Sequence, residues 1–409
     1  MSIKPSGYGE NTLANPSVTS AIPNDAVILV SVDFGEPDYE ESLHELRQLA
    51  GTAGLNIVAT LEGKRSVPDA KLFIGSGKAD ELKSMLRASE DEESDDDVQM
   101  VAFNHDLSPS QQRNLERHIK AKVLDRPGLI LDIFAQRAKS HEGKLQVELA
   151  QLEHLSTRLV RGWTHLERQK GGIGVRGGPG EKQIELDRRM IGVRLKQLKE
   201  KLAKLKQQRG MQRKSRKRSN TMTVSLVGYT NAGKSTLFNR LTQSDIYAAN
   251  QLFATLDTTS RKVYLGESEY VDGEAYAGSN MAVISDTVGF IKHLPTTLIE
   301  AFGATLEEAT QADLMLHVVD MASTNRDAQV SQVNAVLNEI SASSVPQILI
   351  LNQIDRLDCV AGFDRDEYGR ICKIRVSAKT GAGLDFIRLA LQEYQQHLKK
   401  LSTLESAYV

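Results

Sequence analysis

The clearest chemistry in this 409-residue chain lies in a glycine-rich segment that begins at Gly228. The segment follows an apolar run at 224–227 and matches the pattern Gly-x4-Gly-Lys-Ser/Thr at every fixed position. Glycines let a backbone bend around phosphate oxygens, and backbone N–H groups at the start of the next helix attract the anion. We expect Lys234 to neutralise the β- and γ-phosphates of a nucleotide and Ser235 to bind Mg²⁺. The alternative is a glycine turn that only packs a helix against a sheet. The segment consists of Gly228, Tyr229, Thr230, Asn231, Ala232, Gly233, Lys234 and Ser235.

Two further segments are suited to magnesium and to the γ-phosphate. The first follows a strand expected at 282–285, where Asp286 would hold Mg²⁺ through water and the Gly289 N–H would contact the γ-phosphate. In the second, Thr255 would bind Mg²⁺ only when a γ-phosphate is present, which predicts a segment that orders and disorders. These segments consist of Asp286, Thr287, Val288 and Gly289, and of Phe253, Ala254, Thr255, Leu256 and Asp257.

The last pair of motifs is suited to a guanine base. The Asp355 carboxylate accepts two hydrogen bonds, and guanine offers N1–H and N2–H side by side whereas adenine does not. Ser-Ala-Lys at 377–379 follows the last expected strand, and its backbone could reach the guanine O6. Each motif is weak alone, but the ordered set, each member after a strand, indicates a guanine-nucleotide-binding domain. The residues are Asn352, Gln353, Ile354, Asp355, Ser377, Ala378 and Lys379.

The elements that must position these motifs alternate between strands and helices, which predicts an α/β protein with parallel sheets. We expect a smaller α/β domain and an antiparallel helical hairpin, followed by a P-loop domain with a doubly wound, mostly parallel sheet. The expected divisions are a disordered tail at 1–24, an N-terminal α/β domain at 25–140, a basic helical hairpin at 141–208, a mobile basic linker at 209–220, and a nucleotide domain at 221–409 that ends in a helix.

Short runs of apolar and β-branched residues give the expected strands. In the first domain they lie at 26–32, 56–61, 72–74, 100–103 and 123–124, with helices at 39–50 and 78–88. In the nucleotide domain they lie at 223–227, 282–285, 314–320, 348–352 and 373–376, with helices at 234–241 and 384–400.

The hairpin is the basic part of an otherwise acidic chain. Residues 137–218 contain 23 Lys and Arg against 8 Asp and Glu, whereas the whole chain has a net charge of −2. Leucines spaced by three and four residues predict two packed helices, joined by a loop with six glycines at 171–180. We interpret the loop and its flanks as an RNA-binding finger; the alternative is a solvated basic face with a flexible turn. The proposed contacts are Arg168, Lys170, Arg176, Lys182, Arg188 and Arg189.

Composition excludes several other classes of protein. No apolar run approaches the roughly 18–20 residues of a membrane helix, and the first twenty residues carry no apolar signal core. The chain has two cysteines, which excludes a disulfide scaffold and a four-cysteine zinc site. We therefore expect a cytoplasmic protein with no membrane insertion, and Mg²⁺ as its metal.

Beyond the nucleotide motifs, the sequence resembles the HflX family of translation-factor-related GTPases. The resemblance rests on the segments 69–78, 123–138, 143–152, 171–177, 286–291 and 301–308. It implies a cytoplasmic GTPase that binds GTP and GDP and associates with the rRNA of the large (50S) ribosomal subunit. It also implies a role in splitting or rescuing ribosomes or in their biogenesis. We expect no DNA partner and a monomer away from the ribosome. The chain departs from the family pattern at Gln353, where the family carries Lys, at Thr258, where it carries Pro, and in the loop at 177–182.

The rate of GTP hydrolysis depends on Mg²⁺, a positioned water and compensation of developing charge. The expected catalytic residues are Lys234, Thr255, Gly289 and Asn231. Phe290 follows Gly289 and cannot orient water by hydrogen bonding, so we expect slow hydrolysis that ribosomes stimulate. Similar GTPases with Asn at the position of Asn231 use K⁺; the alternative is that Asn231 only caps a turn. Two other functions stay open, namely a nucleotide-gated RNA-binding scaffold and an ATPase or helicase-like RNA remodeller.

Overall fold

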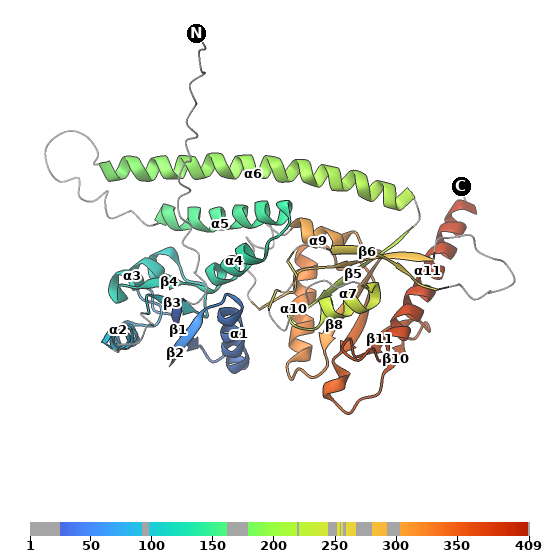
Figure 1. Cartoon of the computed structure of the whole chain (residues 1–409), viewed down its shortest axis with the longest axis horizontal. Coiled ribbons are helices and arrows are strands. Elements are labelled where there is room, and N and C mark those ends of the chain that lie inside the picture. The colour runs from blue at the N-terminus through green and yellow to red at the C-terminus, as the bar shows by residue number, and fades with distance from the viewer. Residues whose placement is uncertain are drawn as a thin grey trace, which may run out of the picture.

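The computed structural model describes residues 25–91, 98–161, 179–218, 221–243, 252–253, 255–256, 259–266, 280–292 and 303–407. The tail expected at 1–24 lies outside these residues. Figure 1 shows two α/β lobes side by side, with one long helix that extends over both of them and a shorter helix beside it over the first lobe. We call these parts the first lobe (25–137), the arm (141–218) and the second lobe (from 221 onward).

The first lobe contains a four-stranded parallel sheet in the order β2-β1-β3-β4. Its central strand β1 is buried along almost its whole length, as expected for a parallel strand covered on both faces. Ser108 and Gln111 form a reciprocal capping box at the start of α3. The elements are β1 (Ala26–Asp33), α1 (Tyr39–Thr52), β2 (Asn56–Lys64), α2 (Ser76–Asp91), β3 (Met100–Phe103), α3 (Pro109–Ile119), β4 (Lys122–Leu124) and α4 (Arg126–Arg137).

The prediction of a strand at 72–74 is wrong. Asp69 and Phe73 exchange backbone hydrogen bonds, and the Asp69 carboxylate accepts the N–H groups of Lys71 and Leu72 at 2.9 and 2.7 Å. This is a tight turn closed by an aspartate side chain, in which Phe73 has a left-handed φ of 60°. Leu72, Phe73 and Ile74 are nevertheless buried in the lobe's core, so burial rather than strand pairing explains their apolar character.

The arm consists of α5 (His141–Arg161) and α6 (Pro179–Arg218), which lie antiparallel in Figure 1. The leucine spacing predicted this packing correctly. A buried seam joins the two helices, and ion pairs such as Arg194 with Glu148 flank it. The seam residues are Leu145, Leu149, Leu152, Ile191 and Leu198.

The prediction of a mobile linker at 209–220 is wrong for residues 209–218, because α6 continues through Arg218. Gln, Arg, Lys and Met are good helix formers, and Gly210 is the one strong exception in this stretch. Arg209 also pairs with Glu142 of α5 at 2.7 Å, and Lys206 pairs with Glu307 of the second lobe at 3.5 Å. The basic charge therefore lies on a continuous helix that contacts both neighbours.

The second lobe contains a seven-stranded sheet in the order β10-β11-β9-β8-β5-β7-β6, in agreement with the expected doubly wound fold. The inner strands are parallel, and the edge strands β6 and β10 are antiparallel additions that the sequence did not predict. The strands are β5 (Met222–Gly228), β6 (Thr259–Tyr264), β7 (Met281–Asp286), β8 (Leu314–Asp320), β9 (Gln347–Asn352), β10 (Gly362–Arg365) and β11 (Ile371–Arg375). The helices are α7 (Lys234–Thr242), α9 (Gly303–Thr310), α10 (Arg326–Glu339), the short 3-10 helix η2 (Ile354–Arg356) and α11 (Leu384–Ala407).

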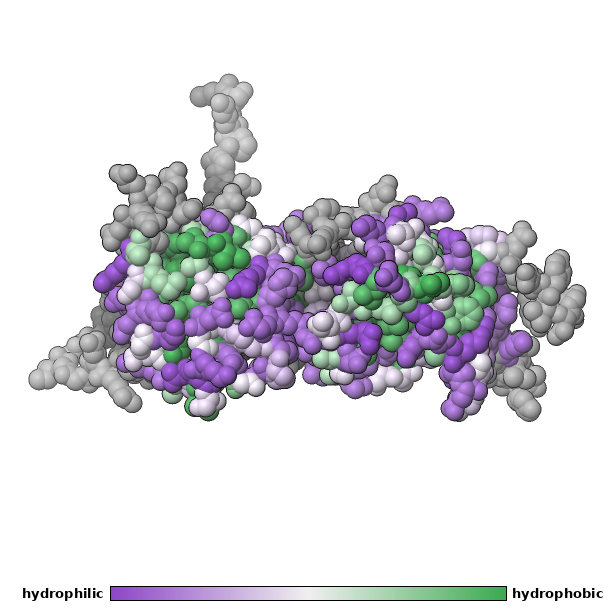
Figure 2. Space-filling view, turned by 90° about the horizontal axis from the view of Figure 1, so that it is seen from below, coloured by the Kyte–Doolittle hydropathy of each residue, from purple (hydrophilic) through white to green (hydrophobic). Residues whose placement is uncertain are grey.

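Seen from below, hydrophilic residues cover most of both lobes, and hydrophobic residues gather in a separate area on each lobe (Figure 2). No helix within the described residues has both the length and the apolar character needed to cross a membrane. The order of the strands places the carboxyl end of β5 inside the sheet, between β8 and β7. Ligands of doubly wound sheets bind at this position, where the strand order reverses.

Candidate functional site

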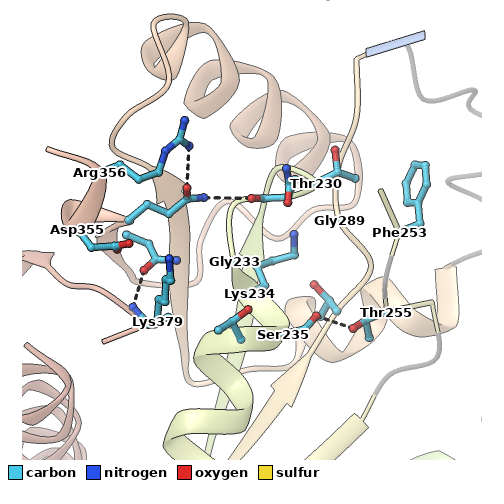
Figure 3. Close-up of a pocket in the computed structure, with 16 residues that line it drawn as sticks. Thr230, Gly233, Lys234, Ser235, Phe253, Thr255, Gly289, Asp355, Arg356 and Lys379 are labelled. Carbon is cyan, nitrogen blue, oxygen red and sulfur yellow. Dashed lines mark hydrogen bonds between the residues drawn. The ribbon is translucent and has the colours of Figure 1, made fainter. Parts of the chain in front are cut away.

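A cavity of about 410 Å³ lies at the carboxyl ends of the second lobe's strands, and we call it the P-loop cavity. It gathers residues from each of the motifs singled out in the sequence (Figure 3). The predicted residues that line it are Thr230, Asn231, Gly233, Lys234, Ser235, Phe253, Thr255, Thr287, Gly289, Asn352, Gln353, Asp355, Ala378 and Lys379.

Ten other predicted residues are not among those that line the described cavity. Ala254 and Asp257 lie outside the described residues. Tyr229, Leu256 and Val288 are packed toward the first lobe, in the same apolar cluster as its helices. The remaining ones are Gly228, Ala232, Asp286, Ile354 and Ser377, which are also not among the lining residues.

The two glycines of the phosphate loop are required by its geometry. Gly228 and Gly233 have φ angles of 148° and 90°, which side chains rarely adopt. A Cβ at Gly228 would lie 2.1 Å from the backbone oxygen of Val318, and one at Gly233 would lie 2.3 Å from Nδ2 of Asn352. The loop therefore lies so close to β8 and β9 that no side chain fits at either position.

Lys234 extends along this loop, and its side chain is buried. Its Nζ donates hydrogen bonds to the carbonyl oxygens of Gly228 and Tyr229, at 3.0 and 2.6 Å. Burial lowers the pKa of the Lys234 amine to about 8, although the nearby Asp286 carboxylate opposes that shift. The ammonium is thus held inside the loop that is expected to surround the phosphates.

The three predicted magnesium ligands contact one another. Ser235 Oγ donates to Oδ2 of Asp286 at 2.9 Å and lies 2.6 Å from Oγ1 of Thr255. Burial raises the pKa of the Asp286 carboxyl, and the charge of Lys234 opposes this. The buried Oδ1 of Asp286 has no hydrogen-bond partner among the described residues. A hard cation with oxygen ligands fits this set, since it would use the oxygen that protein donors leave unpaired.

Backbone hydrogen bonds join the segment after β7 to the phosphate loop at Phe290. Thr230 N donates to Phe290 O at 2.7 Å, and Phe290 N donates to Gly228 O at 3.1 Å. The Phe290 side chain is buried among apolar residues between the lobes, so it packs and offers no group to water. Thr287 Oγ1 donates to the carbonyl oxygen of Leu226 and so joins the residue after β7 to strand β5.

The base-recognition motifs are joined to the phosphate loop through Asn352. Its Nδ2 donates to Ala232 O, and its Oδ1 accepts the N–H of Ala378, both at 2.9 Å. Ser377 Oγ donates to Oδ1 of Asp355 at 2.6 Å, which fixes the carboxylate at the cavity wall. The strand ends of β9 and β11 and the phosphate loop therefore form one hydrogen-bonded unit.

Tyr229 has a role that the sequence did not suggest. Its hydroxyl donates to Oε1 of Glu45 in the first lobe at 2.6 Å and accepts the backbone N–H of Lys292 at 2.8 Å. Glu45 in turn pairs with Arg126, which is 1% exposed. Burial raises the pKa of the Tyr229 hydroxyl, so it stays protonated. No local pattern could have signalled these partners, because Tyr229 and Glu45 are 184 residues apart.

The predicted RNA contacts that the structure describes do not line the P-loop cavity. Arg188 and Arg189 are exposed on α6. Lys182 belongs to the same helix, although its side chain is outside the described set. Arg168, Lys170 and Arg176 lie outside the described residues.

Three family models match successive parts of the chain. The model described as "GTP-binding GTPase N-terminal" matches residues 40–135, and "GTP-binding GTPase Middle Region" matches residues 137–216. The model described as "50S ribosome-binding GTPase" matches residues 223–353, which contain the phosphate loop. These matches follow the order of the first lobe, the arm and the second lobe.

Similar proteins extend over most of the chain. The GTPase HflX of Escherichia coli (strain K12) is 49% identical over 367 residues, which is 90% of this chain and 82% of that protein. The GTPase HflX of Magnetococcus marinus is 46% identical over 371 residues, with coverage of 90% and 81%. A crystal structure of SsGBP with GDP covers 92% of this chain and 99% of its own, at 22% identity and a TM-score of 0.49.

Proposed function

We propose that this chain, which belongs to the HflX family of GTPases, is a nucleotide-dependent switch that acts on the large ribosomal subunit in the cytoplasm. As a member of that family, the chain binds and hydrolyses GTP. The observation that carries the proposal is the P-loop cavity, where the phosphate loop, the Ser235–Thr255–Asp286 contacts and Asp355 meet. The match to a model described as a 50S ribosome-binding GTPase supports the choice of partner.

In this proposal the nucleotide lies across the carboxyl ends of β5, β7, β9 and β11. Lys234 and the N–H groups of the phosphate loop bind the β- and γ-phosphates, and Asp355 accepts the N1–H and N2–H of guanine. Ser235, Thr255 and Asp286 would hold Mg²⁺, and the unpaired Oδ1 of Asp286 supports this assignment. The ion would neutralise the charge that develops on the phosphate oxygens.

We assign slow hydrolysis to the chain alone because Phe290 is buried between the lobes and offers nothing to the attacking water. The Gly289 N–H and Thr255 would contact the γ-phosphate side of the site, and a ribosomal partner would complete it. Asn231 lines the P-loop cavity and has a left-handed φ of 61°, and we propose that it helps to hold a K⁺ ion near the phosphates. Equal GTPase rates in K⁺ and Na⁺ would contradict the K⁺ assignment.

The arm is the proposed rRNA-binding part. α6 presents Arg188 and Arg189 to solvent on a helix that runs across both lobes (Figure 1). Basic residues on an exposed helix neutralise phosphates, and their contribution falls as salt rises. We propose that Arg168, Lys170, Arg176 and Lys182 extend this surface around the glycine-rich loop. Replacing Arg188 and Arg189 by Glu should weaken cosedimentation with 50S subunits and flatten its salt dependence.

The test of the proposed function is GTP turnover by the full chain with and without purified 50S subunits. We expect turnover to rise at least about tenfold on addition of 50S subunits, since the partner must supply the group that Phe290 lacks. Unchanged turnover despite 50S binding would favour the nucleotide-gated RNA-binding scaffold. Equal competition by ATP and GTP would favour the ATPase or helicase-like remodeller. To distinguish splitting, rescue and assembly, ribosomes are incubated with the protein and a non-hydrolysable GTP analogue. The kind of ribosomal particle that then accumulates indicates which of the three processes the protein serves.

A further inference from the structure

Arg356 lines the P-loop cavity and was not among the residues singled out in the sequence. It follows Asp355 directly and ends the short helix η2. In Figure 3 its side chain lies on the same side of the cavity as Asp355 and Lys379, away from Ser235 and Thr255. Arg356 therefore lies at the end where the base is expected, not at the phosphate end.

Two acceptors hold the Arg356 guanidinium in place. Its Nη1 donates to Oδ2 of Asp320 at 3.1 Å and to Oε1 of Gln353 at 2.9 Å. The Arg356 side chain is 59% exposed, so one side of the group still faces the open cavity and solvent. Asp320 is the last residue of β8, which makes the anchor part of the sheet.

Gln353 connects this arginine to the phosphate loop. Its Nε2 donates to the carbonyl oxygen of Asn231 at 3.2 Å, while its Oε1 accepts from Arg356. The Gln353 backbone has a left-handed φ of 67°, which costs energy in a residue with a side chain and turns that side chain between the two partners. A continuous hydrogen-bonded chain thus runs from Asp320 through Arg356 and Gln353 to Asn231.

We propose that Arg356 is a nucleotide-contacting residue that determines affinity for the base. Its guanidinium packs on a face of the guanine recognised by Asp355, and Gln353 and Asp320 hold it there. A guanidinium is flat and weakly hydrated, so it stacks on aromatic rings such as a purine. The long apolar stem of a lysine is absent at position 353, and the Gln353–Arg356 pair fills that wall of the cavity. This inference rests on the proposed guanine site.

The test is titration of the full chain with fluorescently labelled GDP. Arg356→Ala should weaken GDP binding about 3- to 30-fold, the range for a partly desolvated cation on an aromatic ring. It should raise KM for GTP by a similar factor and change kcat much less, because the proposed contact is made to the base and not to the reacting phosphates. Arg370→Ala is the matched control: Arg370 is similarly exposed and paired with a carboxylate, but it lies outside the P-loop cavity.

A double-mutant cycle tests the role of Gln353 as a positioning residue. Gln353→Ala should also weaken GDP binding, and the double variant with Arg356→Ala should lose less than the product of the two effects. The unfolding midpoints of the nucleotide-free variants should match that of the parent, which separates binding from folding. GDP affinity of Arg356→Ala equal to that of Arg370→Ala would overturn this inference. Failure of the parent chain to bind GDP would instead overturn the proposed function.

Discussion

At the scale of single residues, burial gives Lys234 a measurable pH dependence. Its pKa is lowered to about 8 in the folded protein, whereas an unfolded lysine titrates near 10.4. Between these values the unfolded chain binds more protons at this residue, so the free energy of unfolding rises with pH from 8 toward 10. Below pH 8 the residue is protonated in both states and its contribution is constant.

We therefore expect nucleotide-free protein to gain stability from pH 8 to 10 relative to the Lys234→Met variant. Chemical denaturation of both proteins across this range measures the difference, which isolates Lys234 from the other lysines. The window ends just above pH 10 because the lysine of the unfolded chain also loses its proton there. Parallel stability curves for the two proteins would show that the amine is not buried as described.

At the same scale, the sequence predicts residues whose partners are close in the chain. The phosphate loop could be found because its glycines, Lys234 and Ser235 all act within one turn between a strand and a helix. Arg356 was missed because nothing in its immediate neighbourhood distinguishes it from a surface arginine. Its position depends on Asp320, which lies 36 residues earlier in the chain, at the end of strand β8.

At the scale of elements, burial and periodicity decided which predictions were correct. The inner parallel strands are mostly apolar and buried, and the leucine spacing of the arm matches its buried seam. The edge strand β6 carries exposed Arg261 and Lys262, so it lacks the apolar pattern that marks an inner strand. The basic residues at the end of α6 predict a linker if charge is read as disorder, but the same residue types favour a helix, and the structure has a helix there.

The helical assignment of 207–218 is tested by Gly210→Ala. A Cβ at Gly210 meets no atom within 4 Å, so the substitution adds helix propensity without a clash. In a helix it should stabilise the arm by roughly 0.5–1 kcal/mol. The measurement is the thermal unfolding midpoint, with Gly192→Ala earlier in the same helix as the control expected to behave alike. A gain at Gly192 with none at Gly210 would support the linker that we first expected.

At the scale of the whole molecule, the two lobes share a core. Phe134 of α4 packs edge-on against Phe253, which lines the P-loop cavity, with ring centroids 4.6 Å apart. Lys292 of the second lobe pairs with Glu36 and Asp38 of the first. Every one of these contacts joins residues more than 100 positions apart, so no local pattern could reveal them. The first lobe therefore packs directly on the segments expected to respond to the γ-phosphate.

The hydroxyl of Tyr229 is the most direct of these connections, since it joins the phosphate loop, Glu45 and the N–H of Lys292. Tyr229→Phe leaves the Glu45 carboxylate and that N–H without this partner in a buried site, at a cost of about 1–3 kcal/mol. Because the lost contacts span both lobes, hydrogen exchange should speed up together in α1, in α4 and at 290–292. Tyr394→Phe is the matched control, because Tyr394 donates to Asp313 within the second lobe alone. Faster exchange in the phosphate loop alone would show that the hydroxyl stabilises only the second lobe. The apolar contacts would then be what couples the two lobes.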